Sequence, residues 1–337
     1  MPGGQPSTEM KRLIGLLAVA LTACGSSTPV GSPSAAPVQL TVSYSNVVPD
    51  NLPVWIAKEA GIFSKNGLDV DLQLIQSTQG MSALLSGQTQ LADIGGSEAL
   101  SADAEGADMV VLANLTPVSP YIFYAAPGIK DASGLKGKKV GTTSPGGSAD
   151  IATRLALQKL DLDPTKDVTV VNLGSVSNVT AAMLNGAVQA SVSHPPDSQQ
   201  LAAKGFHPLL DLAHQKLPFA SVTVVTKRSY ASANKEVVQK FIDSVVEAIA
   251  REKKDRAFST GVLKKYFKSD DDALMGSAYD FYAKEVVQQP PYCQTAQFAA
   301  SQAVLGQKSD KVRSFDLSKL FDNSFVKTAV DRGLAKT

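Results

Sequence analysis

The chain repeats one series of strand-like and helix-like segments, and this internal repeat at long spacing limits the fold more than any other feature. The two copies are most alike in ALLSGQTQLADI (83–94) and AMLNGAVQASV (182–192). Strands that alternate with helices favour right-handed crossovers and a largely parallel sheet. The sequence therefore predicts an α/β protein with two lobes, each a mostly parallel sheet with flanking helices.

The spacing of apolar residues changes along the chain between the period of a strand and that of a helix, and these changes predict the bounds of the individual elements in both copies. In the first copy, strands are expected at 39–45, 68–76, 89–96 and 107–115, and helices at 54–67, 80–88 and 97–106. In the second copy, strands are expected at 138–143, 167–174, 187–194 and 206–212, and helices at 149–162, 178–186 and 197–205.

Two strand-like segments are expected to connect the lobes as hinges. Residues 116–129 would carry the chain from lobe one to lobe two, and residues 217–230 would bring it back. The remaining chain has helical periodicity, with helices expected at 234–254, 274–287 and 318–333, most economically packed on lobe one. Lobe one would then comprise residues 38–120 and 225–337, and lobe two residues 121–224.

The N-terminus has the pattern of an export signal. A basic start precedes an apolar run at 13–23, which is too short to span a bilayer as a mature helix. The run ends in LTAC, so residues 1–24 are interpreted as a lipoprotein signal peptide with lipid attached to Cys24; an ordinary signal peptide is the alternative. Residues 25–37, rich in Ser and Pro, are typical of a flexible tether. We expect an extracytoplasmic, lipid-anchored protein, with Met10 as an alternative start.

The net charge and the cysteine content limit the possible partners and covalent links of the chain. A net charge of +1 over 337 residues argues against nucleic acid as a partner. The second cysteine, Cys293, has no partner for a disulfide if Cys24 carries lipid, and is interpreted as a plain buried residue.

The loops after the predicted strands are candidates for a ligand site, because ligands bind beyond the carboxyl ends of parallel strands. Glycine lets backbone approach a ligand, Ser and Asn offer neutral donors, and helix N-termini favour polar or negative groups. The five loops at equivalent ends of the repeat together favour a cleft for a small solute; they are 45–53, 95–98, 143–150, 174–178 and 194–197.

One of these loops lies within GTTSPGGSAD (141–150), which nearly matches a phosphate-binding loop. Gly147 stands where that loop needs its lysine, and no acidic strand end suits Mg²⁺. A nucleotide function is therefore excluded, and no cofactor or metal is expected.

An exported enzyme is the alternative class. His194 is followed by Asp197, which suggests a base with an orienting carboxylate, but no nucleophile motif accompanies them and the three histidines lack metal-pair spacing. Catalysis, a ligand hydrogen bond and a turn role all remain open for His194. Among aromatic residues near the expected cleft, Tyr121 is a candidate for ligand contact, and Trp55 is equally consistent with core packing.

Three segments carry a resemblance to a known family: 52–72, 134–164 and 183–197. They resemble solute-binding proteins of ABC importers in the family that handles nitrate, aliphatic sulfonates, taurine and thiamine-pyrimidine precursors. The resemblance implies a two-lobed periplasmic-binding-protein fold of type II with two hinge strands. It also implies a non-catalytic monomer that closes on a small polar solute and delivers it to a permease driven by an ATPase.

The resemblance also points to ligand-binding residues in the turns of both lobes. No Lys or Arg lies in the cleft loops, so an anion would depend on helix N-termini and hydroxyls. The cysteine-rich signature of yeast-type pyrimidine synthases is absent; an exported enzyme related to pyrimidine-precursor synthesis, with His194 as base, is the alternative function. The expected ligand-binding residues are Asn46, Asn51, Gly95, Gly96, Ser97, Tyr121, Ser144, Gly147, Ser148, Asn178, His194 and Asp197.

Overall fold

The structure is a computed structural model that describes residues 36–336. The predicted signal peptide (1–24), its lipid-bearing Cys24 and residues 25–35 of the tether lie outside the described residues.

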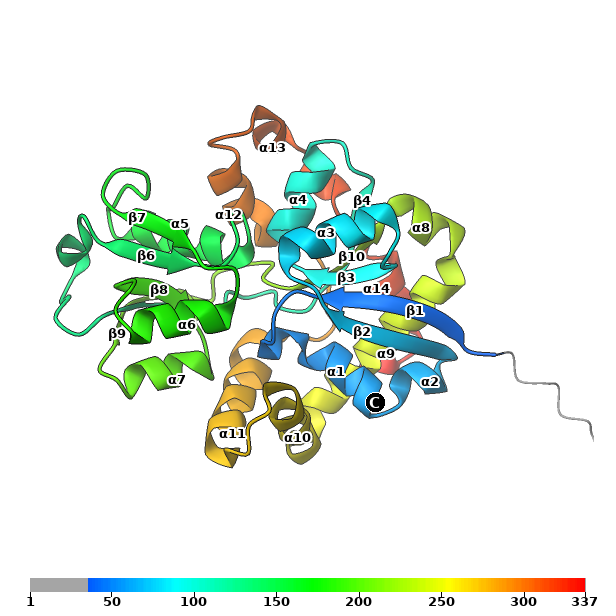
Figure 1. Cartoon of the computed structure of the whole chain (residues 1–337). Helices are drawn as coiled ribbons and strands as arrows, with labels where there is room; N and C mark the ends of the chain where they lie inside the picture. Colours follow the sequence, from blue (N-terminus) through cyan, green and yellow to red (C-terminus); the bar gives the residue numbers. More distant parts are fainter. Residues whose placement is uncertain (1–35, 337) are drawn as a thin grey trace, which may run out of the picture. The chain divides into compact units, whose positions relative to one another are not determined.

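The first sheet has five strands in the order β2-β1-β3-β10-β4 (Figure 1). β1 pairs in parallel with β2 and β3, whereas β10 is antiparallel to both of its neighbours, β3 and β4. The strands are β1 (Val38–Tyr44), β2 (Leu68–Leu74), β3 (Leu91–Ile94), β4 (Met109–Asn114) and β10 (Thr223–Lys227).

The second sheet has the order β7-β6-β8-β5-β9, with β5 antiparallel to β8 and β9. Its strands are β5 (Ile122–Ala125), β6 (Lys139–Thr142), β7 (Thr169–Asn172), β8 (Ala190–Ser193) and β9 (His207–Asp211). Both sheets thus have the same strand order. The second, first and third strands of the copy come first, and the fourth strand of the copy lies at the far edge. Between the third and fourth strands lies a strand that the chain enters from the other lobe, β10 in the first sheet and β5 in the second. The predicted α/β repeat is confirmed. The one antiparallel strand in each otherwise parallel sheet arises because the chain enters it directly from the other lobe.

Helices of each copy cover the sheets as the repeat predicts. In lobe one they are α1 (Leu52–Glu59), α2 (Ile62–Lys65), α3 (Ser77–Ser86) and α4 (Gly96–Ala104); in lobe two they are α5 (Ser148–Lys159), α6 (Val176–Leu184) and α7 (Asp197–Ala202). The single helix expected over 54–67 is wrong. It is broken between α1 and α2 because Gly61 adopts a left-handed φ of +67°, which an L residue rarely takes.

The C-terminal region is helical, as predicted, and most of it packs on lobe one, where α9 contacts both α1 and α14. Short 3₁₀ turns also occur, among them η1 (Pro49–Asn51), and a π-helical turn continues α11 over Tyr282–Val286. The helices are α8 (Arg228–Ala233), α9 (Lys235–Lys254), α10 (Arg256–Phe267), α11 (Asp272–Phe281), α12 (Thr295–Leu305), α13 (Asp310–Ser314) and α14 (Ser324–Asp331).

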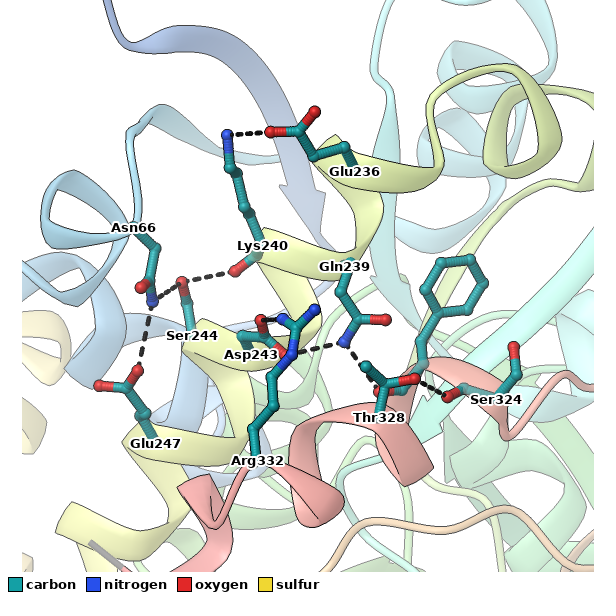
Figure 2. A network of polar contacts seen from close by, with 11 residues as sticks. Asn66, Glu236, Gln239, Lys240, Asp243, Ser244, Glu247, Ser324, Thr328 and Arg332 are labelled. Carbon is teal, nitrogen blue, oxygen red and sulfur yellow. Dashed lines mark hydrogen bonds and ion pairs between the residues drawn. The ribbon is translucent and has the colours of Figure 1, made fainter. Parts of the chain in front are cut away.

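Polar contacts hold α9 between its neighbours (Figure 2). On one side, Asn66, which follows α2, donates to the Ser244 hydroxyl over 2.9 Å. On the other, Asp243 accepts from Arg332 over 2.5 Å and from Gln239 over 2.7 Å. These bonds involve polar residues of α9, of which Asp243 and Ser244 are themselves buried, while the apolar face of the helix enters the core of lobe one.

α12 departs from the expected arrangement, because it packs against both α4 of lobe one and α5 of lobe two. Phe298 lies in an apolar cluster beneath α4, whereas Val304, two turns later, lies in the core cluster of lobe two. α12, over residues where the sequence pattern indicated no helix, therefore contacts both lobes.

Over residues 36–336, no helix has the length and apolar character needed to cross a membrane.

Candidate functional site

A small cavity of about 40 Å³ lies between the lobes, and we refer to it as the inner cavity. The loops that follow β1, β3, β6 and β8 contribute to its wall, together with the start of α6 and both connections between the lobes. Its position matches the carboxyl ends of parallel strands in both sheets. The lining residues are Ser45, Asn46, Val48, Asp50, Gly95, Glu98, Tyr121, Thr143, Ser148, Ala149, Val176, His194, Ser221 and Val222.

Asp50 is the most deeply buried acidic group in this wall, with 2% of the residue exposed. The turn η1 holds it, and the phenol of Tyr282 donates to its Oδ2 over 2.6 Å. Burial, reinforced by the charge of Asp50, raises the pKa of Tyr282, so this phenol remains a donor. The second oxygen, Oδ1, is buried and has no hydrogen-bond partner within the described chain.

Glu98 contributes a second carboxyl group from the first turn of α4. Ser97 donates to its Oε2 over 2.8 Å. Its carboxyl group lies against glycine backbone from both lobes: a Cβ placed on Gly95 would lie 2.1 Å from Oε2, and one placed on Gly147 would lie 3.1 Å from Oε1. Glycine is required at Gly95 for this close approach.

Two rings, Tyr121 and His194, form the aromatic part of the wall. Their centroids are 5.7 Å apart, and the Tyr121 hydroxyl shares a hydrogen bond of 3.2 Å with Ser221. Burial raises the pKa of Tyr121, and the charge of Asp50 raises it further. The Nδ1 atom of His194 lies 3.0 Å from the Pro195 carbonyl oxygen.

Asp197 makes a different contact from the one that a catalytic pair requires. It accepts a hydrogen bond from the Thr180 hydroxyl over 3.0 Å, while the Nδ1 of His194 faces backbone. A base with an orienting carboxylate needs that carboxylate on the ring nitrogen. Within the described chain, His194 and Asp197 therefore do not form the imidazole–carboxylate pair that the sequence suggested.

A larger outer cavity of about 440 Å³ adjoins the inner one, because Ser45, Asn46 and Val176 line both. Residues of α6, α7, α10 and α11 contribute to it, and its charged lining residues are Asp197 and Lys268. The outer cavity connects the loops of both lobes with the C-terminal helices.

The structure brings half of the predicted ligand-binding residues to these cavities. Asn46, Gly95, Tyr121, Ser148 and His194 line the inner cavity, and Asp197 lines the outer one. Ser148 also joins lobe two to a hinge, because its hydroxyl donates to the Ser221 carbonyl over 2.8 Å.

The other predicted residues have supporting positions outside the lining. The Asn51 amide donates to the Asn46 carbonyl over 2.8 Å, and the Asn178 amide donates to the Leu173 carbonyl over 2.8 Å. Ser97 bonds Glu98, and Ser144 accepts a backbone bond from Gly147. Gly96 is packed so closely that a Cβ there would lie 2.6 Å from both Ala220 and Phe298.

Sequence reasoning missed several lining residues, although most lie in loops it had selected. Four of the missed polar residues are direct neighbours of a predicted residue, whereas Ser221 lies in the second connection between the lobes, far from any of them. The sequence of a loop does not show which of its side chains points inward. The missed polar residues are Ser45, Asp50, Glu98, Thr143 and Ser221. Trp55 belongs to the core of lobe one, where its ring stacks on Tyr266 at 4.3 Å.

The chemistry of a metal or thiol site is not found in the described part of the chain. No group of three or more His, Cys, Asp or Glu side chains is placed to hold a metal over residues 36–336. Cys293 is buried, and burial raises the pKa of its thiol, which lowers its reactivity.

Two matched α/β lobes, two chain connections between them and a cavity lined from both lobes define the periplasmic-binding-protein fold. Solved structures agree. The aliphatic sulphonate binding protein SsuA of Escherichia coli is 21% identical with a TM-score of 0.67, covering 84% of this chain and 99% of that chain. The nitrate-binding protein NrtA of Synechocystis PCC 6803 is 18% identical with a TM-score of 0.69, covering 88% and 89%. The desulfurization enzyme DSZB shares the fold, at 18% identity and a TM-score of 0.64, covering 87% and 99%.

The chain belongs to the NMT1/THI5-like family, whose model matches residues 48–255. It is also similar to YtlA of Bacillus subtilis (strain 168), a protein named for a binding role, with 24% identity over 279 residues that cover 80% of each chain. The predicted resemblance and fold class are confirmed at this level.

Proposed function

We propose that the protein is the solute-binding component of an ABC import system, and that it captures a small polar solute in the inner cavity. The observation that carries this proposal is the lining, which combines lobe-one groups such as Asp50 and Glu98 with lobe-two groups such as Ser148 and His194. A solute that contacts both walls binds the closed arrangement better than an open one, and so favours closure.

The hinges of this movement are the segments 116–129 and 217–230. We infer that lobe one comprises residues 38–120 and 225–337, and lobe two residues 121–224. α12 would limit the rotation, because it contacts α4 of one lobe and α5 of the other. A closed protein with solute inside would then present both lobes to a membrane permease, whose cytoplasmic ATPase drives import.

The N-terminal pattern gives the proposed location. We infer that residues 1–24 are a signal peptide, that Cys24 carries lipid, and that residues 25–37 tether a monomeric binding protein to an extracytoplasmic membrane face. Mass spectrometry of the protein from a membrane fraction tests this, since a diacylglyceryl group on a chain that begins at Cys24 is expected and a soluble, unmodified chain contradicts it.

Binding without turnover is favoured over the enzymatic alternative. The relevant observation is that Asp197 bonds Thr180 while the His194 Nδ1 faces the Pro195 carbonyl, so the pair expected for a base with its orienting group is not formed. The sulfonate- and nitrate-binding relatives suggest the size class of the solute, a few heavy atoms with polar groups.

Solution scattering, together with mass spectrometry of the co-purified small molecules, tests the proposed function. The radius of gyration should fall when the co-purified solute is added back to protein stripped of it, and the solute should be recovered unaltered. A chemically changed product identifies an enzyme instead. Unchanged scattering at saturating solute contradicts the two-hinge closure.

A further inference from the structure

The charged side chains in the wall of the inner cavity are both acidic. Asp50 and Glu98 line it, and among its lining residues within 36–336 there is no Lys or Arg. An oxyanion gains from cationic side chains and loses from carboxylates at close range. One ammonium group, that of Lys268, lies in the lining of the outer cavity, which also holds Asp197. The inner wall therefore has the charge that suits a cation.

Helix N-termini, the other feature that attracts anions, already face a carboxyl group of the protein. α4 begins at Gly96 and α5 begins at Ser148, one from each lobe. Glu98 lies between these starts, as the distances of 2.1 Å from a Cβ on Gly95 and 3.1 Å from a Cβ on Gly147 show. Its negative charge occupies the position from which a bound anion would interact with both helices.

Asp50 offers an acceptor that the protein leaves unused. Its Oδ2 takes the Tyr282 phenol, whereas Oδ1 is buried without a partner in the described chain. A buried carboxyl oxygen without a hydrogen-bond donor is unfavourable. A solute that donates a hydrogen bond to this oxygen would remove that cost and so bind more tightly. Burial is the main cause that raises the pKa of Tyr121, and the negative charges of Asp50 and Glu98 raise it further. Both carboxylates therefore act on the same part of the wall, next to Tyr121.

We propose that the solute carries a positively charged nitrogen with at least one N–H, as in an ammonium, amidinium or guanidinium group, and that this nitrogen donates to Asp50 Oδ1. The hydroxyls of Ser45, Thr143 and Ser221 line the same cavity and accept further N–H bonds. The ring of Tyr121 adds a face that attracts cations. This inference rests on the proposed binding function and names its substrate class.

Titration calorimetry with protein freed of co-purified solute tests the charge of the solute. The cationic probes are putrescine, agmatine and 4-aminopyridine, and the anionic probes are nitrate and ethanesulfonate. We expect at least one cation to bind, and to bind more tightly than either anion. Binding of an anion without any cation overturns the inference and leaves the import function standing. Binding of none of the five overturns the inference, and an additional lack of any co-purified solute also counts against the proposed function.

Variants of the same shape identify the groups responsible. Asp50→Asn keeps an oxygen for Tyr282 but removes the charge, and should weaken the best cation by about 30-fold or more, the range for a buried charge that loses its partner. Glu98→Gln should weaken it by a smaller factor, because its carboxyl group already has Ser97 as donor. Asp310→Asn, whose side chain is 90% exposed in α13, is the control and should change nothing.

The variant outcomes also decide the inference if Asp50→Asn does not fold well, which a thermal melt reveals. Glu98→Gln then takes its place, since loss of either charge must weaken a cation and must not weaken an anion. Equal cation affinity in wild type and in the folded variants overturns the assignment of these carboxyl groups. Tighter cation binding in either variant overturns it as well.

Discussion

The phenol of Tyr282 donates a 2.6 Å hydrogen bond to Asp50, from residues that are 232 positions apart in the chain. Tyr282 begins the π-helical turn after α11, and its ring also packs edge-on against His194 of lobe two, with centroids 5.9 Å apart. One side chain of the C-terminal region therefore supports a wall residue from each lobe.

Removing that hydroxyl with Tyr282→Phe should lower both stability and solute affinity. Asp50 would remain buried but lose the Tyr282 phenol, the one side-chain donor that it has within residues 36–336, at a cost of about 1–3 kcal/mol. Urea unfolding measures the stability, and calorimetry with the co-purified solute measures the affinity. Tyr292→Phe, a tyrosine outside the inner cavity, is the control. An unchanged affinity would show that Tyr282 does not position Asp50.

Two neighbouring glycines should respond differently to alanine. A methyl group at Gly95 would approach the Glu98 carboxyl group and the Ser148 hydroxyl at 2.1 and 2.4 Å, so Gly95→Ala should push the lobes apart and weaken binding at least tenfold. At Gly96 the methyl would instead meet Ala220 and Phe298, and Gly96→Ala should cost about 1–3 kcal/mol of stability through overpacking.

Calorimetry and thermal melts separate these two effects. Gly261→Ala, in helix α10 with open space around it, is the matched control and should be neutral or slightly stabilising. If Gly95→Ala and Gly96→Ala lost the same amount of stability, Gly95 would not differ from Gly96 in the way proposed, as a position near the ligand rather than a packing position.

Stability should fall as the pH rises from about 4.5 toward 8. Burial raises the pKa of Glu252 to about 8 from an ordinary 4.5; the nearby Lys253 opposes this shift and the charge of Asp50 adds to it. Because the folded state holds the proton more tightly, this contribution is full below the unfolded pKa and is lost as the pH passes through the folded one. The loss reaches roughly 4 kcal/mol, at about 1.4 kcal/mol per pKa unit.

Glu252→Gln should flatten this dependence, because its side chain stays neutral at every pH. Burial also raises the pKa of Asp93, so Asp93→Asn should act in the same direction. Chemical denaturation at several pH values from 4.5 to 8.5 measures the slope. Parallel slopes in Glu252→Gln and wild type would show that Glu252 does not titrate as its burial requires.

His194→Ala should weaken solute binding without abolishing the fold. The imidazole lines the inner cavity and packs on Tyr121, so the variant loses a contact and leaves a gap, which together cost about 1–3 kcal/mol or roughly 5- to 150-fold in affinity. His207→Ala, on strand β9, is the control. If the wild-type protein converted the solute to a product and His194→Ala did not, the enzymatic alternative would be favoured.

The repeat made much of the fold predictable, because the same order of strands and helices can pair in only one economical way twice. Asn46, Ser148 and His194 were found since loops after parallel strands converge at one edge. Glu98 directly follows the predicted Ser97, but the sequence cannot show that Gly147 brings the start of a second helix to the Glu98 carboxyl group.

α12 could not be predicted for a related reason. Its residues are small or apolar around much of the helix, so no single stripe indicates which surface is covered. Only the folded protein shows that Phe298 packs with lobe one while Val304 packs with lobe two. Asp50 was missed because a short 3₁₀ turn, rather than a strand end, turns its side chain inward.

The exchanged hinge strands also set an order of assembly. β3 and β4 are both made before lobe two, yet they do not pair with each other, because β10 lies between them and is made after lobe two is complete. A chain that emerges from its N-terminus must therefore hold β4 apart from its sheet for more than a hundred residues of synthesis. The first lobe to begin is the last to close, and lobe two, whose five strands are contiguous in the chain, can form its sheet while lobe one is still open.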